Sequence, residues 1–337
     1  MNSDDINNKS PRNVPVELVE FIKTGSKFII AGHKEPDGDC VGSQLALGSV
    51  LLRSGKEVIL CSAGPFMRVE VIGLTGHFLS SITEKERSGA RVIIVDCASK
   101  ERTGSLENSL NGLPCAIIDH HAAGDHSLST PERPVYIDSE LPSCTLLIDK
   151  LITALGQELT KEEANFLLFG LCTDTGFFRY VDENSAVVFE AAARIVRHGA
   201  NPKKIFNLMN GGKTLQSRIF MGHVLSRVES HFDGKLLLCW ETLEEYNTFG
   251  FKNRDSDSLI KLLLAVEGVE VIVIIRQECA DNCTVSLRSV STIDVAQIAA
   301  SLGGGGHKNA AGLTMKDSIS NVKEIMLKTI KNSFDHL

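Results

Sequence analysis

Residues 27–54, KFIIAGHKEPDGDCVGSQLALGSVLLRS, join a short apolar run, a polar turn and a segment with apolar side chains at helical spacing. The run at 27–31 has the length and composition of a buried parallel strand. The segment at 40–54 ends at Gly55, the residue type favoured just beyond a helix. This stretch therefore predicts a strand, a turn and a helix, which is the repeating unit of an α/β sheet.

The same pattern recurs along the chain. In the first part, further buried strands are predicted at 57–63, 91–97 and 115–121, separated by segments long enough for crossover connections. Helices are predicted at 144–156, 161–176 and 185–199 and in the stretch after Thr214. Beyond residue 230, strands are predicted at 235–241, 269–278 and 283–289, and helices at 255–266, 294–302 and 320–333.

The predicted fold class is therefore α/β with two domains, which agrees with the length of 337 residues. We expect an N-terminal domain at 1–200, built on a mostly parallel sheet with flanking helices. A helical linker follows at 201–229. A smaller α/β domain with a mixed sheet occupies 230–337.

Composition excludes several classes of protein. The chain has 35 Lys and Arg against 42 Asp and Glu, a net charge of -7, which argues against a broad basic surface for long nucleic acids. Nine cysteines, an odd number, lie mostly in apolar stretches and indicate a reducing compartment. The N-terminus is polar and no apolar run approaches the ~18 residues that span a bilayer. We expect a cytoplasmic protein without a membrane partner.

Polar side chains gather where the predicted strands end, the edge at which α/β sheets bind ligands. They are His33, Asp37 and Asp39 after the first strand, Asp96 after the third, Asp119, His120 and His121 after the fourth, and Asp174 in a loop-like CTDTG. So many carboxylates in one crevice would repel one another unless cations neutralised them. Any one of these residues alone has an ordinary explanation, such as a helix N-cap, but the joint order indicates a metal site.

Oxygen and imidazole donors without thiolate favour Mn²⁺, with Mg²⁺ or Co²⁺ as alternatives and Zn²⁺ less suitable. The donors overfill a single site that must also admit substrate and water. Two ions ~3.5–4 Å apart fit better, and such a pair activates water for in-line attack on phosphorus.

The motifs HKEPDGD (33–39), VDCA (95–98), IDHH (118–121) and CTDTG (172–176) resemble those of the DHH phosphoesterases. GGGGHKNAAG (303–312) is similar to the signature of the DHH-associated C-terminal domain. The chain most resembles the stand-alone NrnA-type oligoribonucleases, which also hydrolyse 3'-phosphoadenosine-5'-phosphate (pAp). We expect it to lack the extra nucleic-acid-binding fold of RecJ-type exonucleases and the membrane segments of cyclic-dinucleotide phosphodiesterases.

The resemblance implies a role for each motif residue. One Mn²⁺ would be held by His33, Asp37 and Asp96, and a second by Asp39, Asp96, His120 and Asp174, so that Asp96 bridges. Asp119 would orient an imidazole. His121 would face the scissile phosphate, where it could stabilise charge or protonate the leaving oxygen.

The second domain carries a candidate anion grip. A glycine run can bring backbone N–H groups close to a phosphate, and a nearby guanidinium can bind it in two places. The candidate substrate-binding residues are Gly304, Gly305, Gly306 and His307, with Arg288 and Ser289 at a strand end and Arg179 from the first domain.

We therefore expect a phosphoric ester hydrolase that releases 5'-mononucleotides from short RNA or DNA oligonucleotides, including linear dinucleotides such as pGpG, and that converts pAp to AMP. A homodimer is compatible with the resemblance. The alternatives are a cyclic-dinucleotide phosphodiesterase, a family II inorganic pyrophosphatase, and a non-catalytic nucleotide sensor. A pyrophosphatase would not be expected to carry GGGGH, and a sensor would be expected to have lost a ligand.

Overall fold

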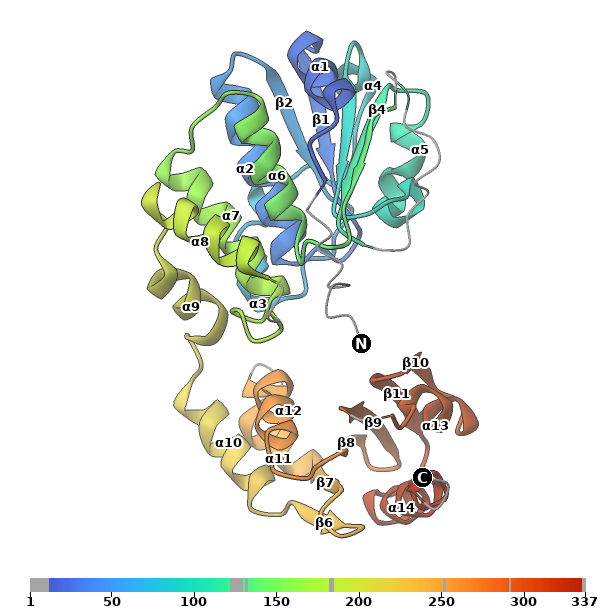
Figure 1. The fold of residues 1–337 in the computed structure, drawn as a ribbon. Helices are drawn as coiled ribbons and strands as arrows, with labels where there is room; N and C mark the ends of the chain where they lie inside the picture. Colours follow the sequence, from blue (N-terminus) through green and yellow to red (C-terminus); the bar gives the residue numbers. More distant parts are fainter. Residues whose placement is uncertain are drawn as a thin grey trace, which may run out of the picture. The chain divides into compact units, whose positions relative to one another are not determined.

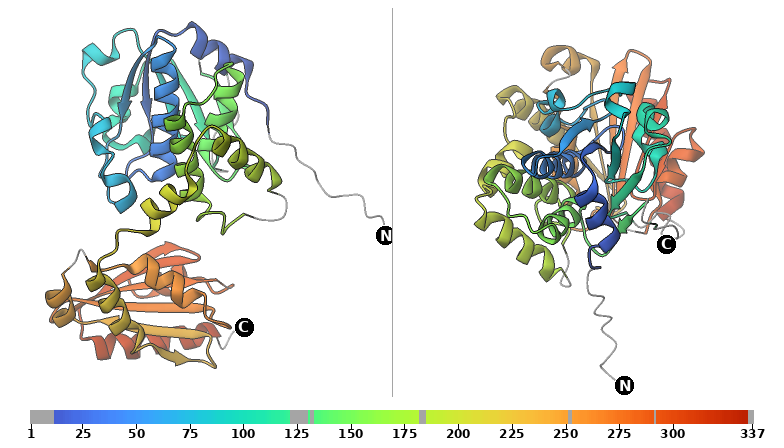
Figure 2. Two further views of the ribbon diagram at one scale, coloured as in Figure 1. Left: turned by 90° about the vertical axis from the view of Figure 1, so that its left-hand side faces the viewer. Right: turned by 90° about the horizontal axis from the view of Figure 1, so that it is seen from above.

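The chain forms two compact units, Met1–Gly211 and Gly212–Leu337, in the computed structural model shown in Figures 1 and 2. The structure describes residues 12–121, 130, 133–181, 185–250, 253–290 and 292–334. The boundary between the units lies within the stretch 201–229. No helix of these described residues is both long and apolar enough to cross a membrane.

The first unit is built on a five-stranded parallel sheet in the order β2-β1-β3-β4-β5. Its strands are β1 Lys27–Ala31, β2 Glu57–Cys61, β3 Arg91–Val95, β4 Cys115–Asp119 and β5 Val135–Ile137. Strand β2 lies on one side of β1, and the chain then crosses over to place β3 on the other side of β1. Such a reversal opens a crevice at the carboxyl ends of the two central strands.

Helices cover both faces of this sheet, as Figure 1 shows for α2 and α6 on one face and α5 on the other. The first face packs against α1 Val16–Thr24, α2 Gly38–Arg53, α6 Cys144–Ala154 and α7 Lys161–Asp174. The second packs against η2 Lys100–Leu106 and α5 Glu107–Leu110. The remaining helices are α3 Val69–Ile72, η1 Thr75–His77, α4 Glu84–Arg87, α8 Ala186–Arg197 and α9 Pro202–Asn210. The predicted first domain, a mostly parallel sheet with flanking helices, is confirmed.

Helices α2 and α7 approach each other closely because glycines face the contact. A Cβ added to Gly42 would lie 2.6 Å from the carbonyl oxygen of Phe166. An ion pair between an exposed guanidinium and a buried carboxylate fixes the same interface, since Nε of Arg53 donates to Glu163 Oε1 over 2.8 Å. The loop-like CTDTG begins within α7, of which Asp174 is the last residue, in agreement with the helix predicted at 161–176.

The second unit contains a six-stranded mixed sheet in the order β10-β11-β9-β8-β7-β6, with β7 and β8 parallel and the other pairs antiparallel. Its strands are β6 Glu229–His231, β7 Leu236–Glu241, β8 Val271–Cys279, β9 Asn282–Ser289, β10 Gly305–His307 and β11 Ala310–Met315. Its helices are α10 Leu215–Leu225, α11 Leu243–Phe249, α12 Ser256–Leu264, α13 Val295–Ser301 and α14 Ile319–Phe334. The predicted mixed α/β domain is confirmed.

The two faces of this sheet differ in how they are covered. One face is buried under α13 and α14 along its strands. On the other face, β7 and β8 are buried under α10 and α12. Beyond β8 this face stays partly exposed, at Arg288 of β9 and at Ala310 and Gly312 of β11. The outer strands therefore offer an accessible polar surface.

Candidate metal centre

The acidic and histidine side chains meet at the carboxyl edge of the first sheet, where the order reverses between β1 and β3. His33 follows β1, Asp96 follows β3 and Asp119 ends β4. Each of the two central imidazoles lies near more than one carboxylate. His33 Nε2 is 3.8 Å from Asp37 Oδ1, and His120 Nε2 is 3.2 Å from Asp174 Oδ2.

Asp96 lies between these two histidines. Its Oδ2 is 3.4 Å from His33 Nε2, whereas its Oδ1 is 3.3 Å from His120 Nε2. The side chain is buried, and the residue has a φ of 59°, a conformation that non-glycine residues adopt at a cost. The Asp96 N–H donates to the Ile118 carbonyl over 2.9 Å, which anchors β3 to β4 at this point. The Asp96 carboxylate thus presents one oxygen to the His33 imidazole and the other to the His120 imidazole.

Asp39 is held by the N-terminus of α6. Its Oδ2 accepts from the N–H of Cys144 over 2.5 Å, and its Oδ1 accepts from the N–H and the hydroxyl of Thr145 over 2.9 and 2.7 Å. A helix N-terminus stabilises an anion at this position. Burial, followed by the charges of Asp96 and Asp174, nevertheless raises the pKa of Asp39 well above its usual range. The carboxylate is oriented firmly but needs positive charge nearby.

Asp37 and Asp119 position the backbone around the cluster. Asp37 caps α2, with Oδ1 accepting from the N–H groups of Asp39 and Cys40 over 3.1 Å each. Burial opposes its ionisation, but His33 outweighs burial and the pKa of Asp37 is lowered. Asp119 Oδ1 accepts from the His120 N–H over 2.8 Å and lies 2.7 Å from Nδ1 of His121. Asp119 therefore fixes the orientation of the His121 ring.

The electrostatics of the cluster favour cations. Burial lowers the pKa of His120, but Asp174 and Asp96 outweigh it and raise the pKa to about 11. The pKa of His33 is likewise raised, because Asp37 and Asp96 outweigh its burial. The two imidazoles bind protons strongly because the carboxylates around them are negatively charged, and a bound metal ion would neutralise the same carboxylates.

Unsatisfied atoms show that the residues present fit metal ions. Among the described residues, Asp96 Oδ1, Asp119 Oδ2 and His120 Nε2 are buried and make no well-directed hydrogen bond, although Asp96 Oδ1 and His120 Nε2 lie only 3.3 Å apart. Potential ligand atoms lie within 4.8 Å of one another in the set Asp39, His120 and Asp174, and again in the set His33, Cys40 and Asp96. Buried lone pairs at this spacing are suited to divalent cations. Sequence reasoning missed Cys40, although it follows Asp39 directly in the motif.

Arg179 lies five residues beyond Asp174, after a turn in which Phe177 and Phe178 both have positive φ. The Arg179 side chain is exposed, and its guanidinium is 6.0 Å from the ring centre of Tyr180. This geometry places Arg179 near Tyr180 and shows no part for it in the acidic cluster.

In the second unit, Arg288 and His307 lie in one row across three strands. Arg288 of β9 is opposite Ala310 of β11, and Ala310 is opposite His307 of β10. Residues directly opposite in antiparallel strands project from the same face. The small Ala310 side chain therefore separates a guanidinium and an imidazole on the accessible face. The Ser289 side chain projects from the other, buried face of the sheet, so the structure does not bring the side chains of Ser289 and Arg288 together.

The glycine run is not simply a loop, because Gly305 and Gly306 begin β10. A Cβ on Gly304 would lie 2.4 Å from the Gly312 carbonyl oxygen, and one on Gly306 would lie 2.5 Å from the Ala310 carbonyl oxygen. Close packing on β11 thus explains these two glycines. Around Gly305 an added Cβ would meet nothing within 4 Å, which leaves this position of the run open.

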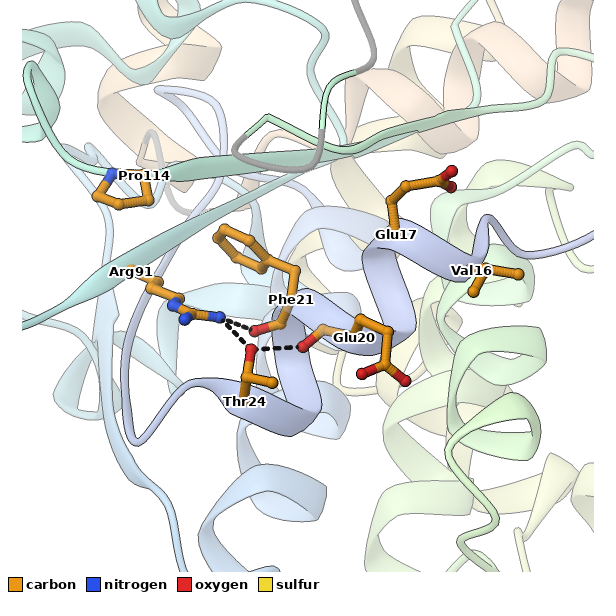
Figure 3. A pocket seen from close by; sticks show the side chains of 7 residues that line it. All are labelled: Val16, Glu17, Glu20, Phe21, Thr24, Arg91 and Pro114. Atoms are coloured by element: carbon orange, nitrogen blue, oxygen red, sulfur yellow. Dashed lines mark hydrogen bonds between the residues drawn. The ribbon is translucent and has the colours of Figure 1, made fainter.

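A separate pocket of about 470 Å³ lies near the amino ends of the strands (Figure 3). It is lined by α1 together with Arg91 at the start of β3 and Pro114 before β4. Arg91 donates to the Phe21 carbonyl and, over 2.8 Å, to Thr24 Oγ1. This pocket is at the opposite edge of the sheet from the acidic cluster and does not form part of it.

Comparisons with known proteins agree with this architecture. The DHH family N-terminal domain matches residues 27–171, and the DHHA1 domain matches residues 241–335. Over 288 residues the chain is 32% identical to the bifunctional oligoribonuclease and PAP phosphatase NrnA of Thermus thermophilus, covering 85% of this chain and 83% of that relative.

Solved structures share the fold. An exopolyphosphatase-related protein from Bacteroides fragilis has a TM-score of 0.77 at 22% identity, with 94% of both chains covered. RecJ from Thermus thermophilus, in complex with Mn²⁺, has a TM-score of 0.51 at 15% identity, covering 98% of this chain and 56% of that one. The chain therefore belongs to the DHH family of phosphoester hydrolases, as a two-domain member of the NrnA type in which a DHHA1 domain follows the DHH domain.

Proposed function

We propose that the protein is a Mn²⁺-dependent phosphoesterase that hydrolyses short oligonucleotides to 5'-mononucleotides and pAp to AMP. The observation that carries this proposal is the position of Asp96, with one oxygen 3.4 Å from His33 and the other 3.3 Å from His120. A carboxylate that lies between two histidines is suited to bridge a pair of cations, each of which would also be bound by one of the histidines.

The residues divide into two cation positions. His33 and Asp37 would complete the first with Asp96, and Asp39, His120 and Asp174 would complete the second with Asp96. When bound, such a pair supplies Lewis acidity and a nucleophilic water at neutral pH. Carboxylate and imidazole donors favour Mn²⁺ among the common ions, and the related fold of RecJ was solved with Mn²⁺.

His121 is the residue to which we assign the leaving group. Its ring is partly exposed, and its Nδ1 is held 2.7 Å from Asp119. With Nδ1–H donating to Asp119, Nε2 remains for the substrate, and the doubly protonated ring would stabilise charge on the leaving oxygen or pass it the Nε2 proton. Asp119 acts through His121 as a positioning residue, because it also accepts from the N–H of that residue over 3.2 Å.

Substrate binding is assigned to the accessible face of the second unit. Arg288 and His307 flank Ala310 on this face, and a guanidinium binds a phosphate in two places. The open position at Gly305 allows a ligand to approach the backbone of β10. A grip of this size suits one terminal phosphate or nucleotide. The name of the relative from Thermus thermophilus, an oligoribonuclease and PAP phosphatase, supports short nucleotide substrates.

The test is product analysis with Mn²⁺-supplemented enzyme on end-labelled oligonucleotides of two to ten residues, alongside pAp and pyrophosphate. We expect mononucleotides from the shortest substrates and AMP from pAp. Turnover of pyrophosphate alone would contradict the proposal in favour of a pyrophosphatase, and binding without turnover would favour a sensor.

The Arg288→Ala variant tests the assignment of the grip. Loss of a hydrogen bond to a charged group costs about 1.5–3 kcal/mol, so KM should rise by roughly 10–100-fold. Metal content should be unchanged, because Arg288 lies in the second unit. A small chromogenic phosphodiester without a second phosphate is the control substrate and should be much less affected. Equal losses on both substrates, or loss of metal, would contradict the assignment.

A further inference from the structure

Cys40 lies in the first turn of α2, directly after Asp39, and its side chain is completely buried. Its sulfur and the ligand atoms of His33 and Asp96 are all within 4.8 Å of one another. Donor atoms around one four-coordinate ion lie at comparable separations, because each is about 2.0–2.3 Å from the metal. The thiol thus has the position of an additional ligand at the edge of the acidic cluster.

The surroundings of Cys40 fix the sulfur in this place. The side-chain amide of Gln44 donates to the carbonyl oxygens of Ile30 and Cys61, over 2.9 Å each. Its Oε1 consequently faces Cys40 and accepts a hydrogen bond from the thiol over 3.7 Å. Gly32 leaves the necessary room, since a Cβ there would lie 2.1 Å from Sγ. A fixed amide on one side and a bare backbone on the other hold the sulfur beside His33 and Asp96.

We propose that Cys40 supplies a sulfur donor to the cation position held by His33 and Asp96, so that this position accepts a thiophilic divalent cation such as Zn²⁺ or Co²⁺ as well as Mn²⁺. This inference rests on the proposed metal centre. As the metal–sulfur bond forms, the thiol releases its proton to solvent. A thiolate favours softer ions, so the two cation positions of the protein differ in their metal preference.

Other buried cysteines provide a matched control. Cys97 is also completely buried and follows Asp96 directly, and its thiol likewise donates a hydrogen bond over 3.7 Å, to the Val95 carbonyl, but it lies in none of the sets of potential ligands in the described part of the chain. Among the described residues, Cys40 is the cysteine found in a cluster of potential ligands. Cys97→Ser therefore removes a nearby sulfur without removing the proposed donor.

The experiment is absorption spectroscopy of the full-length protein loaded with Co²⁺. A thiolate ligand gives a charge-transfer band in the near ultraviolet, in addition to the visible bands of bound Co²⁺. We expect this band in the wild type and in Cys97→Ser, and its loss in Cys40→Ser. In competition between Zn²⁺ and Mn²⁺, the preference for Zn²⁺ should fall roughly tenfold or more in Cys40→Ser.

A second measurement covers the case in which Cys40→Ser does not fold. X-ray absorption of the Zn²⁺-loaded wild type should show sulfur at about 2.3 Å from the metal. Three results would overturn the inference while leaving the metal centre intact. The wild type could show the visible Co²⁺ bands without the near-ultraviolet band, or the near-ultraviolet band could persist in Cys40→Ser. The third is a shell of only nitrogen and oxygen ligands around Zn²⁺. A wild-type protein that takes up no divalent ion would refute the metal centre and the proposed function as well.

Discussion

The Thr145→Val substitution removes one hydroxyl and leaves the size of the side chain almost unchanged. Thr145 is completely buried, and its Oγ1 donates to Asp39 Oδ1 over 2.7 Å. A hydrogen bond to a charged group contributes about 1.5–3 kcal/mol. Because a cation requires Asp39 to be ionised, we expect this bond to contribute to metal affinity, and its loss should weaken binding by roughly 10–100-fold.

Stability measurements separate this effect from ordinary destabilisation. Without a bound cation, burial and the charges of Asp96 and Asp174 raise the pKa of Asp39, and we expect its hydrogen bond from Thr145 to contribute the roughly 1 kcal/mol typical of one hydrogen bond. Thr103→Val is a matched control, because the buried Thr103 hydroxyl donates to the Lys100 carbonyl over 2.5 Å. Both variants should lose about 1 kcal/mol of unfolding free energy in the presence of a chelator.

The decisive assay is Mn²⁺ titration by calorimetry, with thermal unfolding at saturating Mn²⁺. Thr145→Val should bind Mn²⁺ more weakly and gain less stability from it, whereas Thr103→Val should resemble the wild type in both respects. Equal Mn²⁺ affinity in the two variants would refute the argument that α6 holds Asp39 for the metal.

Two further predictions concern the interface of α2 and α7. Glu163→Gln should lower the unfolding free energy at pH 7 by about 2–3 kcal/mol, less than for a fully buried pair because Arg53 is one-third exposed. Burial opposes ionisation of Glu163, but Arg53 and Thr160 outweigh burial, so the pKa of Glu163 is lowered in the folded protein. The contribution of Glu163 to the unfolding free energy is therefore fully present above its usual pKa of about 4.3. It is lost as the pH falls through the lower pKa of the folded state. Chemical unfolding of both proteins from pH 7 to pH 3 checks this, and a difference that grows on acidification would contradict it. Gly170→Ala would place a Cβ 2.8 Å from Asp39 Oδ1 and should cost about 1–3 kcal/mol while weakening Mn²⁺ binding. Gly222→Ala in α10, where an added Cβ meets nothing within 4 Å, should instead be neutral or stabilising, and equal effects of the two changes on unfolding would count against the packing argument.

Local patterns predicted much of the first unit. The strand at 27–31 was found with the same bounds, because a short apolar run between glycines has few alternatives in an α/β chain. The rule that ligands gather at carboxyl ends of strands also predicted where His33 and Asp96 would lie. These inferences need only the chain direction and the period of hydrophobic residues.

Features that depend on distant contacts were not predictable in this way. The bonds from Thr145 to Asp39 join residues 106 positions apart and follow from the packing of α6. The strand β10 has no apolar run from which it could be predicted. Glycine is required in it because β11 packs too closely for a side chain at Gly306. The Thr and Gly residues around Asp174 suggest a loop, whereas the apolar spacing predicts a helix at 161–176, and α7 continues to Asp174.

Two local signals were available but were not used. The alternation of side chains along β9 predicts that the Ser289 side chain projects from the face opposite Arg288. Cys40 was not singled out, although its place directly after Asp39 puts it in the turn that carries the acidic motif.

Metal content per chain tests the central claim most directly, namely that Asp96 is shared by two cation positions. Each protein is equilibrated with Mn²⁺, freed of unbound ion and measured by elemental analysis. We predict two ions per chain in the wild type, about one in Asp174→Asn and fewer than one in Asp96→Asn, since Asp96 faces both donor groups. An Asp96→Asn protein that folds and retains one full ion, or a wild type that binds a single ion, would contradict the shared ligand.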